Sequence, residues 1–408
     1  MFHEDFLRAL PKTDLHCHLD GSLRLGTLLE LSREQGIPLP SNTEEGLRSL
    51  VFKQTYRDLP DYLRGFAYTV AVLRNAEALE RVAFELGEDC LAEGVRYLEV
   101  RLAPQLLVRD GFEVVDILQA VAKGLGRVER EHERSSAVAE RGEPPFRFGI
   151  ICCAMRLFDS GFSPYYARLI GALGQWRLPE VYGAASLSLA RMVVHARDSL
   201  GLPVVGFDLA GAEAGHPASD HIDAYAHAQR HFLKRTVHAG EAYGPESIFQ
   251  AITRLHADRI GHGTHLYSVD QVAVEDPNRY VRDLSEYIAD RRVLIEVCVT
   301  SNLQTMPDLK RVEDHPVGRM IEERLSVSFC SDNRLMSNTT VSRELGLVTR
   351  AFNLSPAELR NVVLHGFKRS FFPGTYVEKR AYVRKVIDHY DQVARTFGVP
   401  DVSRGEAG

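Results

Sequence analysis

Short apolar runs alternate with longer amphipathic stretches along almost the whole sequence. The runs are continuously apolar, which is typical of parallel strands that are buried on both faces. We expect eight such strands: Thr13–Leu19, Tyr97–Arg101, Phe146–Met155, Val204–Ala210, Arg235–Ala239, Arg259–Gly261, Leu294–Val299 and Ser326–Ser331. Helical periodicity marks several of the stretches between them, namely Asp61–Glu93, Gly183–Leu200, Asp220–Phe232 and Val341–Phe352.

This alternation predicts an α/β protein. Eight strand candidates favour a single (β/α)8 TIM-type barrel with extra helices, and a doubly wound sheet is the alternative. The 408 residues would suffice for one barrel or for two or three smaller domains, so length alone does not decide. Because no repeat or low-complexity tract divides the chain, we expect one domain over residues 1–408. A surface insertion at 133–145 and a frayed tail at 403–408 are expected within it.

Composition and charge exclude several classes of partner. The net charge of −6 has no basic stripe, which argues against nucleic acid. No run reaches the roughly 20 apolar residues of a membrane span, and the first residues lack the apolar stretch of a signal peptide. The six cysteines are scattered without CxxC spacing, as in reduced intracellular proteins. We therefore expect a cytoplasmic protein without a membrane partner, and the oligomeric state stays open.

Histidines end three of the predicted strands. His16 and His18 stand two residues apart, so both imidazoles project to one face of a strand and can reach one ion. His238 and His262 end the fifth and sixth strands, on the face where barrel enzymes place their chemistry. Glycines on both sides of His262 allow a ligand to approach the backbone closely. Packing in the core or in a tight turn is the alternative reading of each histidine alone.

Two carboxylates extend this pattern. Asp332 ends the eighth strand, where a buried aspartate is costly unless it is paired or bound to a cation. Glu241 follows His238 by three residues and can reach the same pocket without binding the metal, as a proton donor should. Helix capping is the alternative for both. Together the strand ends offer three imidazoles, one carboxylate and one spare histidine, a set that suits zinc, although Fe(II), Co(II) or Mn(II) could also fit.

Seven ordered motifs resemble those of adenosine deaminases within the amidohydrolase superfamily. They are LPKTDLHCHLDGSLR, YLEVRLAP, VVGFDLAGAE, RTVHAGE, RIGHGTHL, EVCVTSNLQT and SVSFCSDNRLMSNTT, and they span nearly the whole chain. The resemblance implies a zinc-dependent hydrolase of purine metabolism that acts on C–N bonds of cyclic amidines. Its expected reaction is the deamination of adenosine, and with it 2′-deoxyadenosine, to give inosine and ammonia.

The resemblance also implies roles for individual residues. One zinc ion per chain is expected on four ligands, which are His16, His18, His238 and Asp332. A metal-activated hydroxide is expected to attack purine C6 while Glu241 protonates N1. His262 would orient the water and help to take its proton, and Asp332 would help to place the hydroxide. Metal-bound histidines usually donate their second N–H to a carboxylate or carbonyl, and the candidates for this outer contact are Glu296, Asp208 and Arg101.

Substrate contacts are implied at four positions: His18, Asp20, Gly211 and Asn333. Asp20 matches the position that holds the ribose 5′-hydroxyl, where adenine deaminases read HxHxEG, so it favours a nucleoside over a free base. The backbone of Gly211 would contact the purine, and Asn333 would lie on its far side.

Two alternatives to adenosine deamination stay open: a sister deaminase acting on adenine or a modified adenine nucleoside, and a nucleoside-binding protein without turnover. Four departures from the family pattern bear on specificity: Cys330, Ser331, Val299 and Met306.

Overall fold

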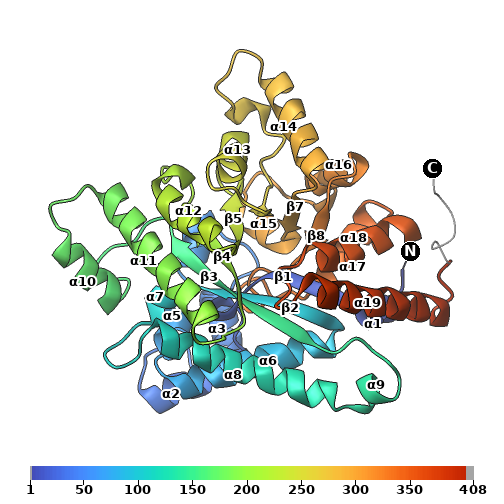
Figure 1. Ribbon diagram of the computed structural model, residues 1–408, viewed down its shortest axis with the longest axis horizontal. Helices are drawn as coiled ribbons and strands as arrows, with labels where there is room; N and C mark the ends of the chain where they lie inside the picture. The colour runs from blue at the N-terminus through green and yellow to red at the C-terminus, as the bar shows by residue number, and fades with distance from the viewer. Residues whose placement is uncertain (1, 401–408) are drawn as a thin grey trace.

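Eight parallel strands form a barrel surrounded by helices in the computed structural model, which describes residues 2–400 (Figure 1). The strands are β1 (Lys12–His18), β2 (Val95–Leu102), β3 (Arg147–Met155), β4 (Val204–Ala210), β5 (Lys234–Ala239), β6 (Arg259–His262), β7 (Leu294–Val297) and β8 (Val327–Phe329). Each strand pairs in parallel with the next in sequence, from β1 to β8. The predicted (β/α)8 barrel is confirmed, and the doubly wound alternative is wrong.

The helices cover the outside of the barrel and both of its ends. In the first half they are α1 (Glu4–Ala9), α2 (Leu25–Gln35), α3 (Glu44–Leu50), α4 (Leu59–Leu63), α5 (Phe66–Val72), α6 (Ala76–Ala92), α7 (Pro104–Leu107), α8 (Val114–Glu133), α9 (Ser136–Ala139), α10 (Pro164–Ala172) and α11 (Leu178–Asp198). In the second half they are α12 (Ile222–Arg230), α13 (Pro245–Thr253), α14 (Pro277–Arg291), α15 (Val299–Thr305), α16 (Val317–Glu322), α17 (Val341–Ala351), α18 (Pro356–Arg369) and α19 (Tyr376–Thr396). No described helix combines the length and the apolarity of a membrane span.

All eight predicted runs contain a strand, because helices cover the barrel and leave its strands buried. Every residue of β1, β2 and β4 is buried, as continuous apolar runs require. The main difference lies at β7, which ends at Val297 because α15 begins at Val299. The predicted run Leu294–Val299 therefore extends past the strand into the next helix.

The stretch Asp61–Glu93, which has one continuous helical period, is divided in the structure. It contains the end of α4, all of α5 and α6. Asn75 separates the last two, since its side chain accepts a hydrogen bond from the amide of Ala78 and begins α6. The division leaves α4 and α5 free to cover one end of the barrel, where Leu63 and Phe66 line a cavity.

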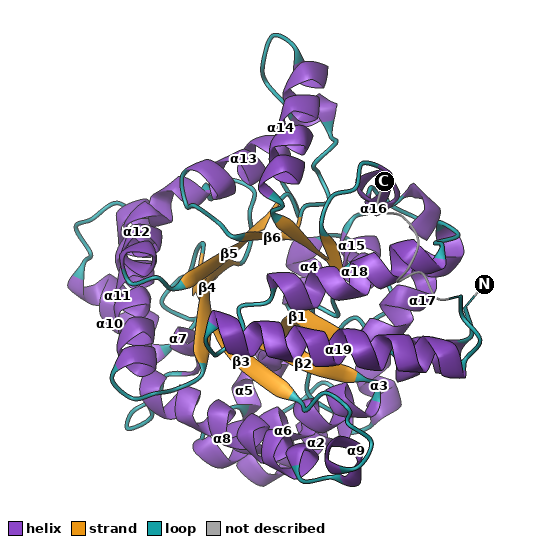
Figure 2. Cartoon of the chain, turned by 45° about the vertical axis from the view of Figure 1, so that its right-hand side comes forward, coloured by secondary structure: helices purple, strands orange, loops and turns teal. Residues whose placement is uncertain are grey.

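The barrel closes between β1 and the residues that follow β8. Cys17 and Asp332 form a parallel bridge, in which the Asp332 amide donates to the carbonyl of His16 at 2.8 Å. At the opposite end, α19 lies across the beginnings of the strands (Figure 2). The hydroxyl of Tyr382 on α19 bonds the carbonyl of Arg96 at the start of β2.

Residues 133–145, expected to be an unstructured surface insertion, connect α8 to β3 and include the one-turn helix α9. Glu143 ties this segment to the barrel through an ion pair of 2.8 Å with Arg96. The predicted tail 403–408 lies outside the described residues.

Candidate active site

A cavity of about 670 Å³ opens at the carboxyl ends of the barrel strands. Eight of the residues selected from the sequence line it: His18, Asp20, Gly211, His238, Glu241, His262, Asp332 and Asn333. The ninth, His16, is fully buried and lies directly against this group. The structure therefore brings all nine residues together, although they come from five different strands or strand ends.

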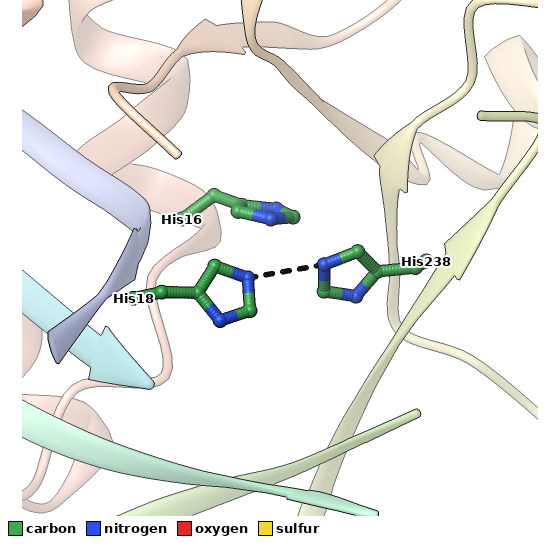
Figure 3. Close-up of side chains that lie close together, drawn as sticks. All are labelled: His16, His18 and His238. Carbon is green, nitrogen blue, oxygen red and sulfur yellow. Dashed lines mark hydrogen bonds between the residues drawn. The ribbon is translucent and has the colours of Figure 1, made fainter. Parts of the chain in front are cut away.

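Three imidazoles converge at the floor of this cavity (Figure 3). His16, His18 and His238 each offer a ring nitrogen within 4.8 Å of the others, and Nε2 of His18 lies 3.2 Å from Nε2 of His238. Oδ1 of Asp332 lies 3.5 Å from Nε2 of both His16 and His18. Tetrahedral ligands at zinc–nitrogen bond lengths are about 3.3 Å apart, so the three imidazoles can share one ion, and Asp332 lies at a suitable distance from two of them. His16, His262 and Asp332 form a second, overlapping group of candidate ligands.

A buried nitrogen without a partner supports the same interpretation. Nε2 of His16 has no hydrogen-bond partner among residues 2–400. Leaving a buried polar atom unsatisfied is unfavourable, and a metal ion would satisfy it. The carboxylate of Asp332 is ionised at neutral pH, because the neighbouring imidazoles of His16, His262 and His18 overcome the effect of burial and hold its pKa below the usual range.

Carboxylates behind the histidines orient their rings. Nδ1 of His16 lies 2.9 Å from Oε2 of Glu296, and Nδ1 of His238 lies 3.0 Å from Oδ2 of Asp208. Arg101 donates to both carboxylates, at 2.8 and 2.9 Å, and all three of these side chains are fully buried. These contacts direct Nε2 of His16 and of His238 into the cavity. Of the three candidates for this outer contact, Glu296 and Asp208 make it, whereas Arg101 bonds the two carboxylates instead.

Glu241 faces this cluster from the end of β5. Burial is the main cause that raises the pKa of Glu241 to about 8, and the charges of Asp332 and Glu213 add to it. The side chain therefore carries a proton at neutral pH, as a general acid must. Its Oε1 lies 3.6 Å from Nε2 of His262.

Glu213 is a functional candidate that the sequence reasoning missed. Its carboxylate accepts hydrogen bonds from the amides of Gly240, Glu241 and Ala242 at 2.8–3.0 Å, and from the hydroxyl of Ser247. A single buried carboxylate thus holds the loop that carries Glu241. Two signals in the sequence could have found it: Glu213 lies three residues after the end of β4, and it is the last residue of the motif VVGFDLAGAE.

A chain of hydrogen bonds behind His262 was also missed. The amide of Val317 donates to Nδ1 of His315, whose Nε2 lies 3.2 Å from Oδ1 of Asn302. Burial lowers the pKa of His315 to about 3, so this ring is neutral and its Nε2 must carry the hydrogen. The Asn302 amide group then donates to Nδ1 of His262 at 3.1 Å.

This chain determines which nitrogen of His262 is protonated. Burial, followed by the neighbouring His16, lowers the pKa of His262 well below its usual range, so the ring is neutral. Because Nδ1 accepts a hydrogen bond, the single hydrogen resides on Nε2 and points toward the cavity. His262 has a left-handed backbone with φ 65°, rare for residues other than glycine and often found at functional sites.

The remaining predicted positions form the wall around the cavity. Burial is the main cause that raises the pKa of Asp20 to about 7. Oδ1 of Asp20 and Oδ1 of Asn333 are both buried without a hydrogen-bond partner among residues 2–400, so they are available to a polar ligand. Gly211 has φ 98°, which only glycine adopts readily and which exposes its backbone to the cavity.

None of the four departures from the family pattern lines the cavity. Ser331 donates to the buried Asp14, and Cys330 contacts the carbonyl of Ser328. Val299 begins α15 and Met306 follows its end. These residues therefore belong to the barrel around the site and are not part of the cavity wall.

Comparisons with known proteins agree with this geometry. A family model described as "Adenosine deaminase" matches residues 11–160 and 167–389. Adenosine deaminase 1 of Streptomyces coelicolor is 36% identical over 94% of this chain and 87% of its own length. The adenosine deaminase of Mycobacteroides abscessus is 36% identical over 92% and 94%, respectively.

Solved structures share the fold at lower identity. An adenine deaminase from Arthrobacter aurescens has a TM-score of 0.72 and 23% identity, and the match covers 93% of this chain and 99% of that one. An amidohydrolase from Burkholderia ambifaria with bound Zn has a TM-score of 0.74 and 22% identity, over 97% and 94%. At this level of sequence identity, the similarity shows a shared fold and not a shared function.

Proposed function

The chain belongs to the adenosine deaminase family, and on that premise we propose that it hydrolyses the 6-amino group of adenosine to give inosine and ammonia. The observation that carries the proposal is the position of Glu241, a buried and protonated acid that faces a cluster of metal-binding groups across one cavity. The enzyme is accordingly a hydrolase of C–N bonds, and 2′-deoxyadenosine is a second expected substrate.

The metal site suits one zinc ion per chain on His16, His18, His238 and Asp332. The nitrogen-rich ligand set and the spacing of its atoms support zinc, as does the zinc-containing amidohydrolase of the same fold. When bound, a divalent ion at this position supplies the activation of water at neutral pH.

Glu241 supplies the proton that the purine ring requires. Attack of water at C6 breaks the aromaticity of the ring, so the adjacent N1 must gain a proton in the same step. A carboxyl group that is neutral at working pH can donate it. The contacts of Glu213 with the amides of residues 240–242 hold this acid in position.

His262 acts as a hydrogen-bond donor. Its neutral ring presents Nε2–H to the cavity, because Asn302 occupies Nδ1. A ring in this state can orient water through the N–H but cannot take a proton at the same nitrogen. This differs from the role of proton acceptor implied by the resemblance. The ionised carboxylate of Asp332, which lies within the metal-binding cluster, is left as the proton acceptor.

A nucleoside is the proposed substrate. A cavity of about 670 Å³ lies within the range of roughly 300–1,000 Å³ typical of small-molecule sites. Leu63 and Phe66 provide an apolar wall for the purine, while Asp20 and Asn333 offer unsatisfied oxygens at its edge. Asp20 supports a nucleoside over adenine, which is the substrate named for one structural neighbour of this chain.

The loss of ultraviolet absorbance by adenosine tests this function. The metal-replete protein would be assayed with adenosine, 2′-deoxyadenosine, adenine and N6-methylated adenosine. Conversion of the two nucleosides, abolished by a chelator and restored by zinc, is the expected result. Turnover of adenine alone, or of the methylated nucleoside alone, would identify the protein as a sister deaminase with that substrate. Binding without turnover of any compound would indicate a nucleoside-binding protein.

A further inference from the structure

A second large cavity, of about 550 Å³, lies at the end of the barrel opposite the active site. It is bounded by the residues that begin β5 or immediately precede β6 and β7, and by the segment between α18 and α19. These two helices cross the barrel end that faces the viewer in Figure 2. The charged residues that line it are Lys234, Arg235, Asp258, Arg291, Arg292, Lys368, Arg369 and Lys379.

The cavity concentrates positive charge in an acidic protein. The whole chain has a net charge of −6, yet seven Lys or Arg side chains and a single carboxylate line this cavity. The carboxylate, Asp258, is already paired with Arg235 at 3.1 Å. Within residues 2–400, the other six cations form no ion pair with a carboxylate. The structure itself thus leaves their charges unneutralised.

Helix ends do not account for this excess. Cations are stabilised near the carboxyl end of a helix, and α12, α13, α14 and α18 all end beside the cavity. Each helix end carries a charge of about −0.5, so four ends offset roughly two of the six unpaired cations. An excess of about four positive charges remains.

Burial, and to a smaller degree the neighbouring cations, lowers the pKa of two lysines in this cluster. Burial, together with Arg360 and Arg369, lowers the pKa of Lys368. Burial lowers the pKa of Lys379 to about 8; the nearby Glu99 opposes this shift, and neighbouring cations, among them Lys234 and Arg369, add to it. The ammonium of Lys379 donates to the carbonyls of Lys368 and Ser370. Such a cluster is tolerated more readily when an anion enters it.

We propose that this basal cavity binds a small anion that carries two or more adjacent phosphate groups. The cations come from four separate segments around one opening, so they can contact several phosphate oxygens at once, as Lys and Arg do in phosphate sites. Ile252, Val293 and Phe371 form an apolar part of the wall that can receive an attached group such as a nucleoside. The size of the cavity suits a nucleoside triphosphate.

Isothermal titration calorimetry with two probes tests the proposal. Inorganic tripolyphosphate presents the phosphates alone, and uridine triphosphate adds a pyrimidine nucleoside that is not an adenine compound. Both probes are expected to bind, with an affinity that falls as salt is raised. Equal affinities would assign recognition to the phosphates, whereas tighter binding of uridine triphosphate would add recognition of the nucleoside.

A charge-removing variant locates the binding. Lys234→Gln, Arg291→Gln and Lys368→Gln combined remove three exposed cations from the rim while keeping polar side chains there. Affinity for tripolyphosphate is expected to fall at least about tenfold, since exposed ion pairs contribute modestly one by one. The matched control is Arg177→Gln, Arg279→Gln and Arg384→Gln, which removes the same charge from exposed positions elsewhere.

Two results would overturn the proposal. One is the absence of binding by either probe to the unaltered protein at low salt. The other is an equal loss of affinity in the rim variant and in the control, which would show attraction to overall charge instead of a site. Adenosine turnover of both variants should be unchanged, so the outcome is independent of the proposed catalytic function.

Discussion

The amide of His18 donates a hydrogen bond to the carbonyl of Asp332 over 2.7 Å, and Nε2 of the same histidine lies 3.5 Å from Oδ1 of that aspartate. The two residues are thus joined through both main chain and side chain at the place where the barrel closes. Asp332 adopts a left-handed backbone with φ 57° in this bridge. Closure of the fold and assembly of the proposed metal site therefore depend on the same contact.

Removal of the metal should destabilise the barrel, because the proposed ligands join β1, β5 and the end of β8. Ligand binding stabilises a fold by about 4 kcal/mol when the free ligand is at about 1,000 times its Kd. For a chain of 408 residues, in which unfolding entropy is about 2.1 cal/mol/K per residue, this corresponds to a rise in Tm of about 5 °C. Thermal unfolding followed by circular dichroism, with chelator or with added zinc, measures the difference. Identical Tm values would contradict a site built into the barrel closure.

Turnover should decline as pH rises, because the protonated form of Glu241 is the active one. Its pKa is raised to about 8, mainly by burial, so the proton is present at lower pH and is lost as pH rises through this value. A bound cation favours the carboxylate, which places the midpoint in the holoenzyme at or below about 8. The pH profile of kcat measures it. A rate that keeps rising into the alkaline range would show that Glu241 acts in its ionised form.

Glu213→Gln should weaken catalysis through Glu241. The amide cannot accept three amide hydrogens as a carboxylate does, and hydrogen bonds to charged groups contribute about 1.5–3 kcal/mol each. We expect kcat to fall about 10- to 100-fold. Removing the nearby negative charge should also lower the pKa of Glu241, so the alkaline limb moves to lower pH. Glu246→Gln, a half-buried glutamate of the same region, is the control and should change neither quantity. If the alkaline limb of the pH profile does not shift in Glu213→Gln, Glu213 has only a structural role.

Asn302→Asp should reverse the tautomer of His262. A carboxylate at this position accepts a hydrogen from Nδ1, which leaves Nε2 bare toward the cavity. We expect kcat to fall at least about 100-fold, since an incorrect histidine tautomer is costly in catalysis. Nitrogen-15 NMR of the histidine ring reports which nitrogen carries the hydrogen.

Gln304→Glu is the matched control for this prediction, because it adds the same charge to α15 at a buried position. Equal losses of activity in the two variants, or an unchanged tautomer in Asn302→Asp, would contradict the assignment of His262 as a hydrogen-bond donor.

Features encoded locally were predictable from the sequence. Parallel strands buried on both faces require continuous apolar runs, so β4 was located at its true ends, Val204 and Ala210. Residues at strand ends face one side of a barrel, which is why His16, His238 and Asp332 could be grouped without knowing the structure. The ordered motifs then added Asp20 and Gly211, both of which line the cavity.

Features made by contacts between distant segments were not predictable. Asn302 and His315 act on His262, and they belong to a different strand–helix unit of the barrel. Glu213 contacts a loop that begins 27 residues later. The basal cavity likewise combines residues from α12 to α19, and its cations stand as short pairs far apart in the sequence. The quoted motifs contain Glu213 and Asn302, but a single sequence does not show which distant residues they contact.

The most direct test of the proposed mechanism compares adenosine turnover and metal content in the unaltered protein and in Glu241→Gln. The glutamine keeps the shape of the side chain but has no proton to donate to N1. General acid catalysis contributes about 100- to 10,000-fold, so we predict a fall in kcat of that size with the metal content unchanged. Full turnover by Glu241→Gln with its metal retained would contradict the assignment of Glu241 as the proton donor.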